Sequence, residues 1–126
     1  MSEGYRAMKS RDSFVRVKRF ELDEKARRVD ELQYMIRDFE QLAADLERQI
    51  AAEEDRTGVR DVAHFAYSTF AKAAMQRRDN LMSSAAELRA KLESAAKDHD
   101  EARAQLARYD GEDHSVRGIA EGAGAR

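Results

Sequence analysis

The three histidines are the side chains best suited to acid–base or metal chemistry here, because the chain contains no cysteine. His64 falls near an expected turn, His99 on an apolar helical stripe and His114 in a glycine-rich tail. In a helical hairpin His64 and His99 lie too far apart to share a metal ion. A ligand or a pH switch at His99 is conceivable, but a polar residue that fixes the register of a coiled coil is the better interpretation.

The 25 acidic residues are the other possible source of catalytic groups. They fall on helix faces expected to be solvated, where nothing would raise a carboxylate pKa or shape a cleft. The sequence also lacks a phosphate-binding loop, a nucleophile elbow and zinc-ligand spacing. We therefore predict that the protein is not an enzyme and has no cofactor, metal site or small-molecule substrate.

Basic residues crowd the N-terminal stretch, where only Glu3 and Asp12 oppose them. Such a strip can dock phosphates, as basic-region helices do. The neighbouring aromatic residues more naturally complete an apolar contact with a protein, so a protein-docking end is favoured over nucleic acid. The predicted partner-binding residues at this end are Phe14, Lys18, Arg19 and Phe20.

A second aromatic group, formed by Phe65, Tyr67, Phe70 and the nearby Met75, follows the expected turn. Two interpretations stay open for it. Phe65 and Phe70 could simply cap the end of the hairpin, or Tyr67 and Phe70 could form a partner patch, since exposed aromatic side chains dominate interface energetics.

The elements that must position these residues are indicated by where helix breakers are missing. The chain has no proline, and Gly58 alone separates two long runs, 5–57 and 59–110. Each run carries an apolar stripe on a charged background, which predicts two helices folded back on each other. The expected fold is all-α: a two-helix antiparallel coiled-coil hairpin over 1–110 with a disordered C-terminal tail.

The hairpin boundaries follow from the same pattern. Helix one is expected at about 10–56, the turn at about 57–61 and helix two at about 62–109. Gly58 is a candidate for the left-handed residue that ends a helix, and Asp61 for the N-cap of the next. Residues 111–126 are glycine-rich and mixed, so we expect this tail to be disordered.

Helix one has an apolar residue every seven positions along its whole expected length. These residues are Val15, Leu22, Val29, Ile36, Ala43 and Ile50. The partner positions three residues further on are Lys18, Lys25, Leu32, Phe39, Leu46 and Glu53. The seam is therefore predicted to be strong in the middle, from Val29 to Ile50, and weak where lysines replace apolar side chains.

Helix two follows strict alternating spacing of four and three residues. The seam positions are Leu81, Ala85, Leu88, Leu92, Ala95, His99, Ala102, Leu106 and Tyr109, preceded less regularly by Tyr67, Ala71, Ala74 and Arg78. Such regularity could also pair one chain with another copy. The glycine-centred turn favours the hairpin over a dimer.

The composition agrees with a narrow seam rather than a thick core. Charged residues make up 38% of the chain and aromatic residues 7%. The formal net charge of −2 gives no overall field for nucleic acid. No apolar run approaches a membrane span or a signal peptide, so a cytoplasmic location is expected.

Two blocks of sequence resemble the flagellar export proteins of the FliJ family, in their alphaproteobacterial form. The blocks are Met8 to Phe20 and Ala63 to Ala74, the second followed by the segment Gln76 to Leu81. The likeness covers roughly 8–92, which implies that residues 1–7 are an extension or reflect a different choice of start residue. The sequence after Leu92 departs from the family pattern and stops soon after Tyr109, which implies a shortened ring-inserting end.

The resemblance implies a coiled-coil component of the flagellar type III export apparatus, active in motility and chemotaxis. Family members resemble the stalk of rotary ATPases, sit in the ring of the export ATPase and contact the export gate and substrate chaperones. The implied location is cytoplasmic and peripheral, at the inner membrane. Carried over, Tyr67, Phe70, Ala74 and Arg77 would line the surface that faces the gate. A self-associating structural coiled coil and a basic-region nucleic-acid binder remain the alternatives.

Overall fold

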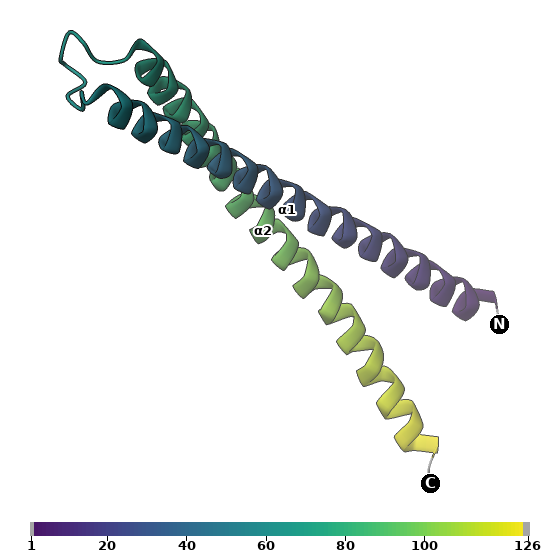
Figure 1. Cartoon of the computed structure of the whole chain (residues 1–126). Coiled ribbons are helices and arrows are strands. Elements are labelled where there is room, and N and C mark those ends of the chain that lie inside the picture. Colours follow the sequence, from purple (N-terminus) through teal and green to yellow (C-terminus); the bar gives the residue numbers. More distant parts are fainter. Residues whose placement is uncertain (1, 125–126) are drawn as a thin grey trace. The chain divides into compact units, whose positions relative to one another are not determined.

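A computed structural model describes residues 2–124 of the chain, and side chains over residues 3–109. It contains two α-helices, α1 (Ser2–Thr57) and α2 (Thr69–Gly124), joined by a loop over 58–68 (Figure 1). No strand occurs among the described residues. The all-α hairpin expected from the sequence is therefore confirmed.

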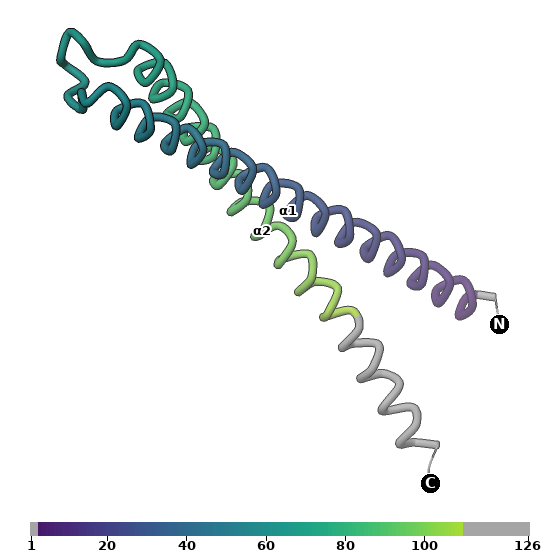
Figure 2. The backbone as a smooth tube through the Cα atoms, viewed as in Figure 1, coloured from purple at the N-terminus to yellow at the C-terminus, as the bar shows by residue number. Residues whose placement is uncertain are grey.

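The chain divides into two compact units, each containing a piece of both helices. The loop-end unit comprises residues 30–93, and the terminal unit comprises residues 1–29 with 94–126. In the loop-end unit the last part of α1 and the first part of α2 run in opposite directions on either side of the loop (Figure 2). In the terminal unit the first part of α1 pairs with the later part of α2.

The core of the loop-end unit follows the predicted seam. Buried side chains are Leu32, Ile36, Ala43, Leu46, Ile50, Tyr67, Ala71, Ala74, Ala85 and Leu88. All ten are positions of the predicted seam; nine lie on the two helices, and Tyr67 lies in the loop just before α2. Ala71 and Ala85 are fully buried, because small side chains let the two helices approach closely. No polar or charged side chain is buried among the described residues.

Two ion pairs also cross between the helices of this unit. Arg89 pairs with Glu40, and Arg78 reaches Glu47 at 3.8 Å. Both join a residue of α1 to one of α2 across the seam. Because solvent-exposed pairs contribute only about 0–1 kcal/mol each, they set the helix register more than they hold the unit together.

The terminal unit is packed more loosely, as the sequence predicts. Its seam residues Val15, Leu22 and Val29 are only half-buried, and so are Leu106 and His99 on the opposite helix. None of its described side chains is buried. The inward-facing lysines of α1 and the alanines of α2 explain this, since they supply too little apolar bulk to exclude water.

Several element boundaries differ from the prediction. Helix α1 begins at Ser2 rather than near residue 10, because residues 5–14 contain no helix breaker and the single glycine at position 4 does not end the helix. Helix α2 begins at Thr69, not near residue 62, so the connection spans 58–68 instead of 57–61. The bounds of α2 run to Gly124, beyond the expected end near residue 109. For the tail expected at 111–126, the structure describes the backbone as far as Gly124 and none of the side chains. Residues 125 and 126 lie outside the described residues.

Helix α2 begins later than predicted because Asp61 caps a turn instead of a helix. Its Oδ1 accepts a hydrogen bond from the Ala63 amide at 3.0 Å, and its carbonyl accepts one from the His64 amide. The helix N-cap is Ser68, whose Oγ accepts a hydrogen bond from the Ala71 amide at 3.1 Å. Both residue types favour either role, so the local sequence does not discriminate between them.

Gly58 ends α1 as predicted. Its φ is +73°, in the left-handed region, and its amide donates to the Glu54 carbonyl at 2.8 Å. Only glycine adopts this conformation without a steric penalty from Cβ. The chain therefore leaves the helix axis at this residue and enters the loop.

Candidate partner-binding surfaces

Tyr67 is buried in the loop-end core rather than exposed on the surface. Only 6% of it is exposed, and it packs in one cluster with Leu46, Ile50, Ala71 and Ala74. Its hydroxyl donates a hydrogen bond to Glu54 Oε2 at 3.2 Å. Burial and the neighbouring Glu54 carboxylate raise the pKa of Tyr67. Tyr67 is thus the residue that closes the core beneath the loop.

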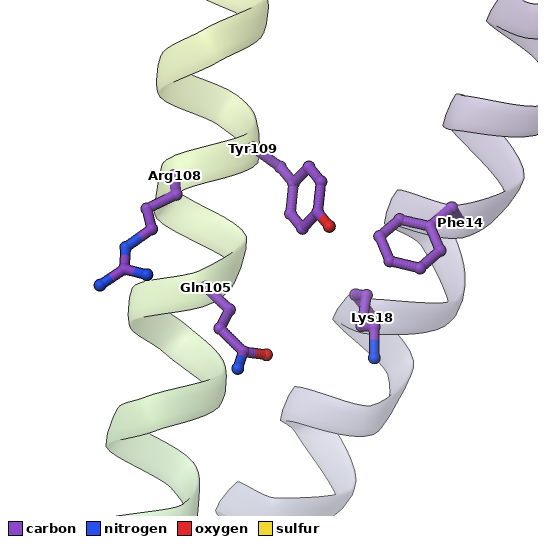
Figure 3. A pocket seen from close by; sticks show the side chains of 5 residues that line it. All are labelled: Phe14, Lys18, Gln105, Arg108 and Tyr109. Atoms are coloured by element: carbon purple, nitrogen blue, oxygen red, sulfur yellow. The ribbon is translucent and has the colours of Figure 1, made fainter.

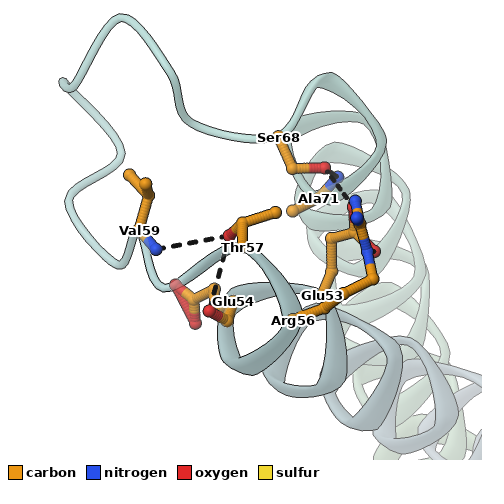
Figure 4. A network of polar contacts seen from close by, with 7 residues as sticks. All are labelled: Glu53, Glu54, Arg56, Thr57, Val59, Ser68 and Ala71. Atoms are coloured by element: carbon orange, nitrogen blue, oxygen red, sulfur yellow. Dashed lines mark hydrogen bonds and ion pairs between the residues drawn. The ribbon is translucent and has the colours of Figure 1, made fainter.

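A polar clasp formed by Glu53, Arg56 and Ser68 joins the end of α1 to the start of α2 (Figure 4). The Ser68 hydroxyl donates to Glu53 Oε1 at 3.0 Å, and the Arg56 guanidinium donates to both oxygens of the same carboxylate. Hydrogen bonds from Arg56 and then from Ser68 lower the pKa of Glu53. The ionised carboxylate is therefore the form that holds the two helix ends together.

This geometry corrects the predicted gate-facing surface, because two of its four residues are buried. Tyr67 and Ala74 are each 6% exposed, so neither can meet a partner while the hairpin is intact. Both occupy seam positions, where the pairing of α1 with α2 covers them. Phe70 and Arg77, in contrast, are exposed on α2, and Phe70 keeps 57% of its surface in solvent.

The structure contradicts the interpretation in which Phe65 and Phe70 cap the end of the hairpin, because both rings are exposed. Tyr67 caps the core, whereas Phe70 is exposed on the first turn of α2. Phe65 is 95% exposed in the loop, and Val62 beside it is 44% exposed. The sequence does not single out Phe65, because its exposure depends on how the loop is folded.

The predicted N-terminal site residues lie in the terminal unit. Arg19 and Phe20 are exposed, and Phe20 keeps 63% of its surface. Phe14 is 41% exposed, and Lys18 sits 5.4 Å from the centroid of its ring while its Nζ donates to Glu21 at 3.3 Å. All four therefore offer at least part of their side chains to solvent.

Phe14 is also paired with a residue that the prediction treated only as part of the seam. The ring of Tyr109 stands at 69° to that of Phe14, with centroids 5.1 Å apart (Figure 3). With Lys18, Gln105 and Arg108 these rings line a shallow recess of about 440 Å³. The recess is open to solvent and lies between α1 and α2. The sequence places Tyr109 at a seam position, and this spacing is the feature from which a contact with the opposite helix can be predicted.

No group of three or more potential metal ligands occurs among the described residues. His64 belongs to the loop, where its Nδ1 accepts a hydrogen bond from the Ala66 amide, and His99 lies half-buried beside Asp100 at 3.6 Å. His114 lies outside the described side chains. Over the part of the chain that the structure describes, no helix is both long and apolar enough to cross a membrane.

Comparisons with known protein families, curated proteins and solved structures found no match to this chain. The arrangement of exposed and buried residues is therefore the main guide to what the protein contacts.

Proposed function

We propose that this protein is a non-enzymatic coiled-coil component of the flagellar type III export apparatus. In this role it serves as the stalk of the export ATPase and links that enzyme to the export gate and to substrate chaperones. It works in the cytoplasm, at the inner face of the inner membrane. The proposal rests on the resemblance of residues 8–92 to the FliJ family.

The observation that carries the proposal is the distribution of side chains over the hairpin. Apolar side chains fill a seam one or two residues wide, and the described surface carries exposed aromatic and basic residues in both units. A two-helix seam leaves no enclosed volume for a substrate. Contact with other proteins is the activity that such a surface supports best.

The two units supply similar chemistry to partners. In the terminal unit, Phe14, Phe20 and Arg19 combine apolar rings with positive charge. In the loop-end unit, Phe70 and Arg77 do the same on α2. We assign the terminal residues to the ATPase and the loop-end residues to the gate, as the resemblance implies.

The test is co-purification of the tagged protein with the export ATPase and with the cytoplasmic domain of the gate protein. Substitution of Arg19 and Phe20 by alanine should weaken capture of the ATPase, and substitution of Phe70 and Arg77 should weaken capture of the gate domain. Exposed Lys91→Ala serves as the matched control. Failure of the wild-type chain to capture either protein contradicts the proposal.

Tyr67 and Ala74 are unsuitable for this test. Both are buried, so their substitution would weaken the hairpin itself and lower binding for a trivial reason. Phe70 and Arg77 are exposed, and their loss leaves the seam intact.

A further inference from the structure

The loop between the helices is an ordered segment that carries a fully exposed aromatic side chain. Phe65 is 95% exposed, more than any other large apolar residue among the described side chains. Its single aromatic neighbour is the His64 ring, stacked at a centroid distance of 4.6 Å and an interplanar angle of 25°. Exposing an aromatic ring in this way has no benefit for folding.

The backbone on both sides of Phe65 is fixed by successive turns. Asp61 anchors the first turn through the Ala63 and His64 amides. His64 anchors the second, because its carbonyl accepts from the Tyr67 amide at 3.0 Å and its Nδ1 accepts from the Ala66 amide at 3.0 Å. Phe65 thus lies between two hydrogen-bonded turns of the loop, which fix its backbone.

Both ends of the loop are also tied to α1. On the outgoing side, Gly58 continues the helix hydrogen bonding, the Val59 amide donates to Thr57 Oγ1, and Arg60 pairs with Asp55. On the returning side, Tyr67 and Ser68 donate to Glu54 and Glu53. A side chain presented on so constrained a backbone loses little conformational entropy when it binds.

The charge around the loop indicates what kind of surface Phe65 meets. From residue 53 to residue 61 the chain carries four acidic and two basic side chains. Anionic lipid headgroups require clusters of lysine and arginine, so a membrane is disfavoured as the partner surface. A second copy of the loop would bring like charges together. A protein surface with basic residues around an apolar pocket is complementary in both shape and charge.

We propose that Phe65 is an anchor residue that inserts into an apolar pocket, rimmed by lysine or arginine, on a partner protein. The inference rests on the proposed function, because both take the protein to act by binding other proteins. It adds Phe65 to the partner-binding residues predicted from the sequence. Phe70, 57% exposed at the start of α2, lies five residues further along the chain and belongs to the gate-facing set.

The experiment replaces Phe65 by the photo-crosslinking residue p-benzoylphenylalanine in cells that express the full chain. Irradiation followed by mass spectrometry identifies the partner and the crosslinked peptide. The expected result is one protein, crosslinked at a segment that lines an apolar pocket with basic residues at its rim. Crosslinks to lipid, to a second copy, or to no partner at all would overturn the inference.

Binding of the identified, purified partner then supplies the quantitative test. Phe65→Ala should weaken binding by about tenfold or more, as for an interface hot spot. Phe65→Tyr should retain most of the affinity, because it keeps the ring. The melting temperature of both variants should match that of the wild type, since 95% of Phe65 is exposed. Equal binding by wild type and Phe65→Ala overturns the inference.

These outcomes separate the inference from the proposed function. If the export ATPase and the gate domain bind the wild type and Phe65→Ala equally, and no other protein crosslinks at position 65, the export role stands and the anchor role fails. If neither export protein binds but a different protein crosslinks through a basic-rimmed pocket, the anchor role stands and the export role fails.

Discussion

At the scale of single residues, the loop end separates two aromatic side chains that the sequence presents as a pair. Tyr67 and Phe70 lie three residues apart, yet Tyr67 is 6% exposed and Phe70 is 57% exposed. The N-cap at Ser68 explains the difference. Tyr67 precedes the helix and turns back over the Ile50 and Leu46 core, whereas Phe70 is already on the outer side of α2.

The first prediction follows from this contrast. Tyr67→Ala should lower the melting temperature strongly, because it removes the largest side chain from a closed cluster. Phe70→Ala should leave the melting temperature almost unchanged, because Phe70 is mostly solvated. Thermal melts followed by circular dichroism at 222 nm measure both. An equal loss in the two variants would contradict the buried position of Tyr67.

A second prediction concerns pH and the carboxylate of Glu53. Hydrogen bonds from Arg56 and Ser68 lower its pKa in the folded state relative to the unfolded state. The stabilisation is therefore fully present above the ordinary glutamate pKa, and it is lost as the pH falls through the lower, folded-state value.

The measurement compares wild type with Glu53→Gln by urea unfolding between pH 7 and pH 3. At pH 7 the variant should be the less stable protein, and the difference should shrink as the pH falls. Glu87→Gln, at an exposed position outside the clasp, is the control and should track the wild type. A difference that stays constant with pH would exclude the clasp as its source.

At the scale of elements, the loop and the seam are specified by different kinds of residue. The end of α1 depends on one glycine with φ of +73°, whereas pairing of the helices depends on a repeated apolar pattern. A change at Gly58 acts on the backbone alone, since no atom beyond Gly58 and its two neighbours in the chain lies within 4 Å of where a Cβ would stand.

Gly58→Ala should therefore destabilise the hairpin by about 1 kcal/mol, the approximate cost of placing a β-carbon in the left-handed region. Gly4→Ala is the matched control. It has equally open surroundings but lies within α1, where alanine is favoured by about 0.5–1 kcal/mol. Chemical denaturation should show opposite signs for the two substitutions, and loss of stability in both would contradict the assigned conformations.

A fourth prediction compares the two units. Leu32 is 1% exposed in the loop-end unit, whereas Leu22 is half-buried in the terminal unit. Leu32→Ala should cost about 2–5 kcal/mol, and Leu22→Ala clearly less, because the terminal seam can let water reach the gap. Native-state hydrogen exchange should give greater amide protection in residues 30–57 than in residues 3–29. Uniform protection along α1 would refute this.

At the scale of the whole molecule, the question is whether the seam pairs within one chain or between chains. In the loop-end unit the apolar seam residues of α1 are covered by those of α2 from the same chain, and cross-helix ion pairs join Arg89 to Glu40 and Arg78 to Glu47. The buried seam residues of this unit are thus covered within one chain.

We therefore expect a monomer. Light scattering should give a mass near 14.4 kDa that does not change with concentration. A mass about twice that value would favour the self-associating coiled coil that the sequence leaves open. In that event the hairpin contacts would need to be exchanged between two chains, as in a domain-swapped dimer.

The sequence by itself determined the secondary structure class and the seam. Heptad spacing places Ile36 and Leu46 on one face of α1, and Ala85 and Leu88 on one face of α2. The period of the apolar pattern decides which residues of a long helix are buried together. It also determined the weak terminal seam, since Lys18 cannot fill an apolar layer.

Only the tertiary structure decided which residues remain for partners. Tyr67 and Ala74 belong to the core, and Phe65 stands exposed, because Ser68 rather than Asp61 caps α2 and the loop folds back on Glu53. Short polar residues serve equally well as turn or helix caps, so their role depends on which contacts with α1 the fold makes available.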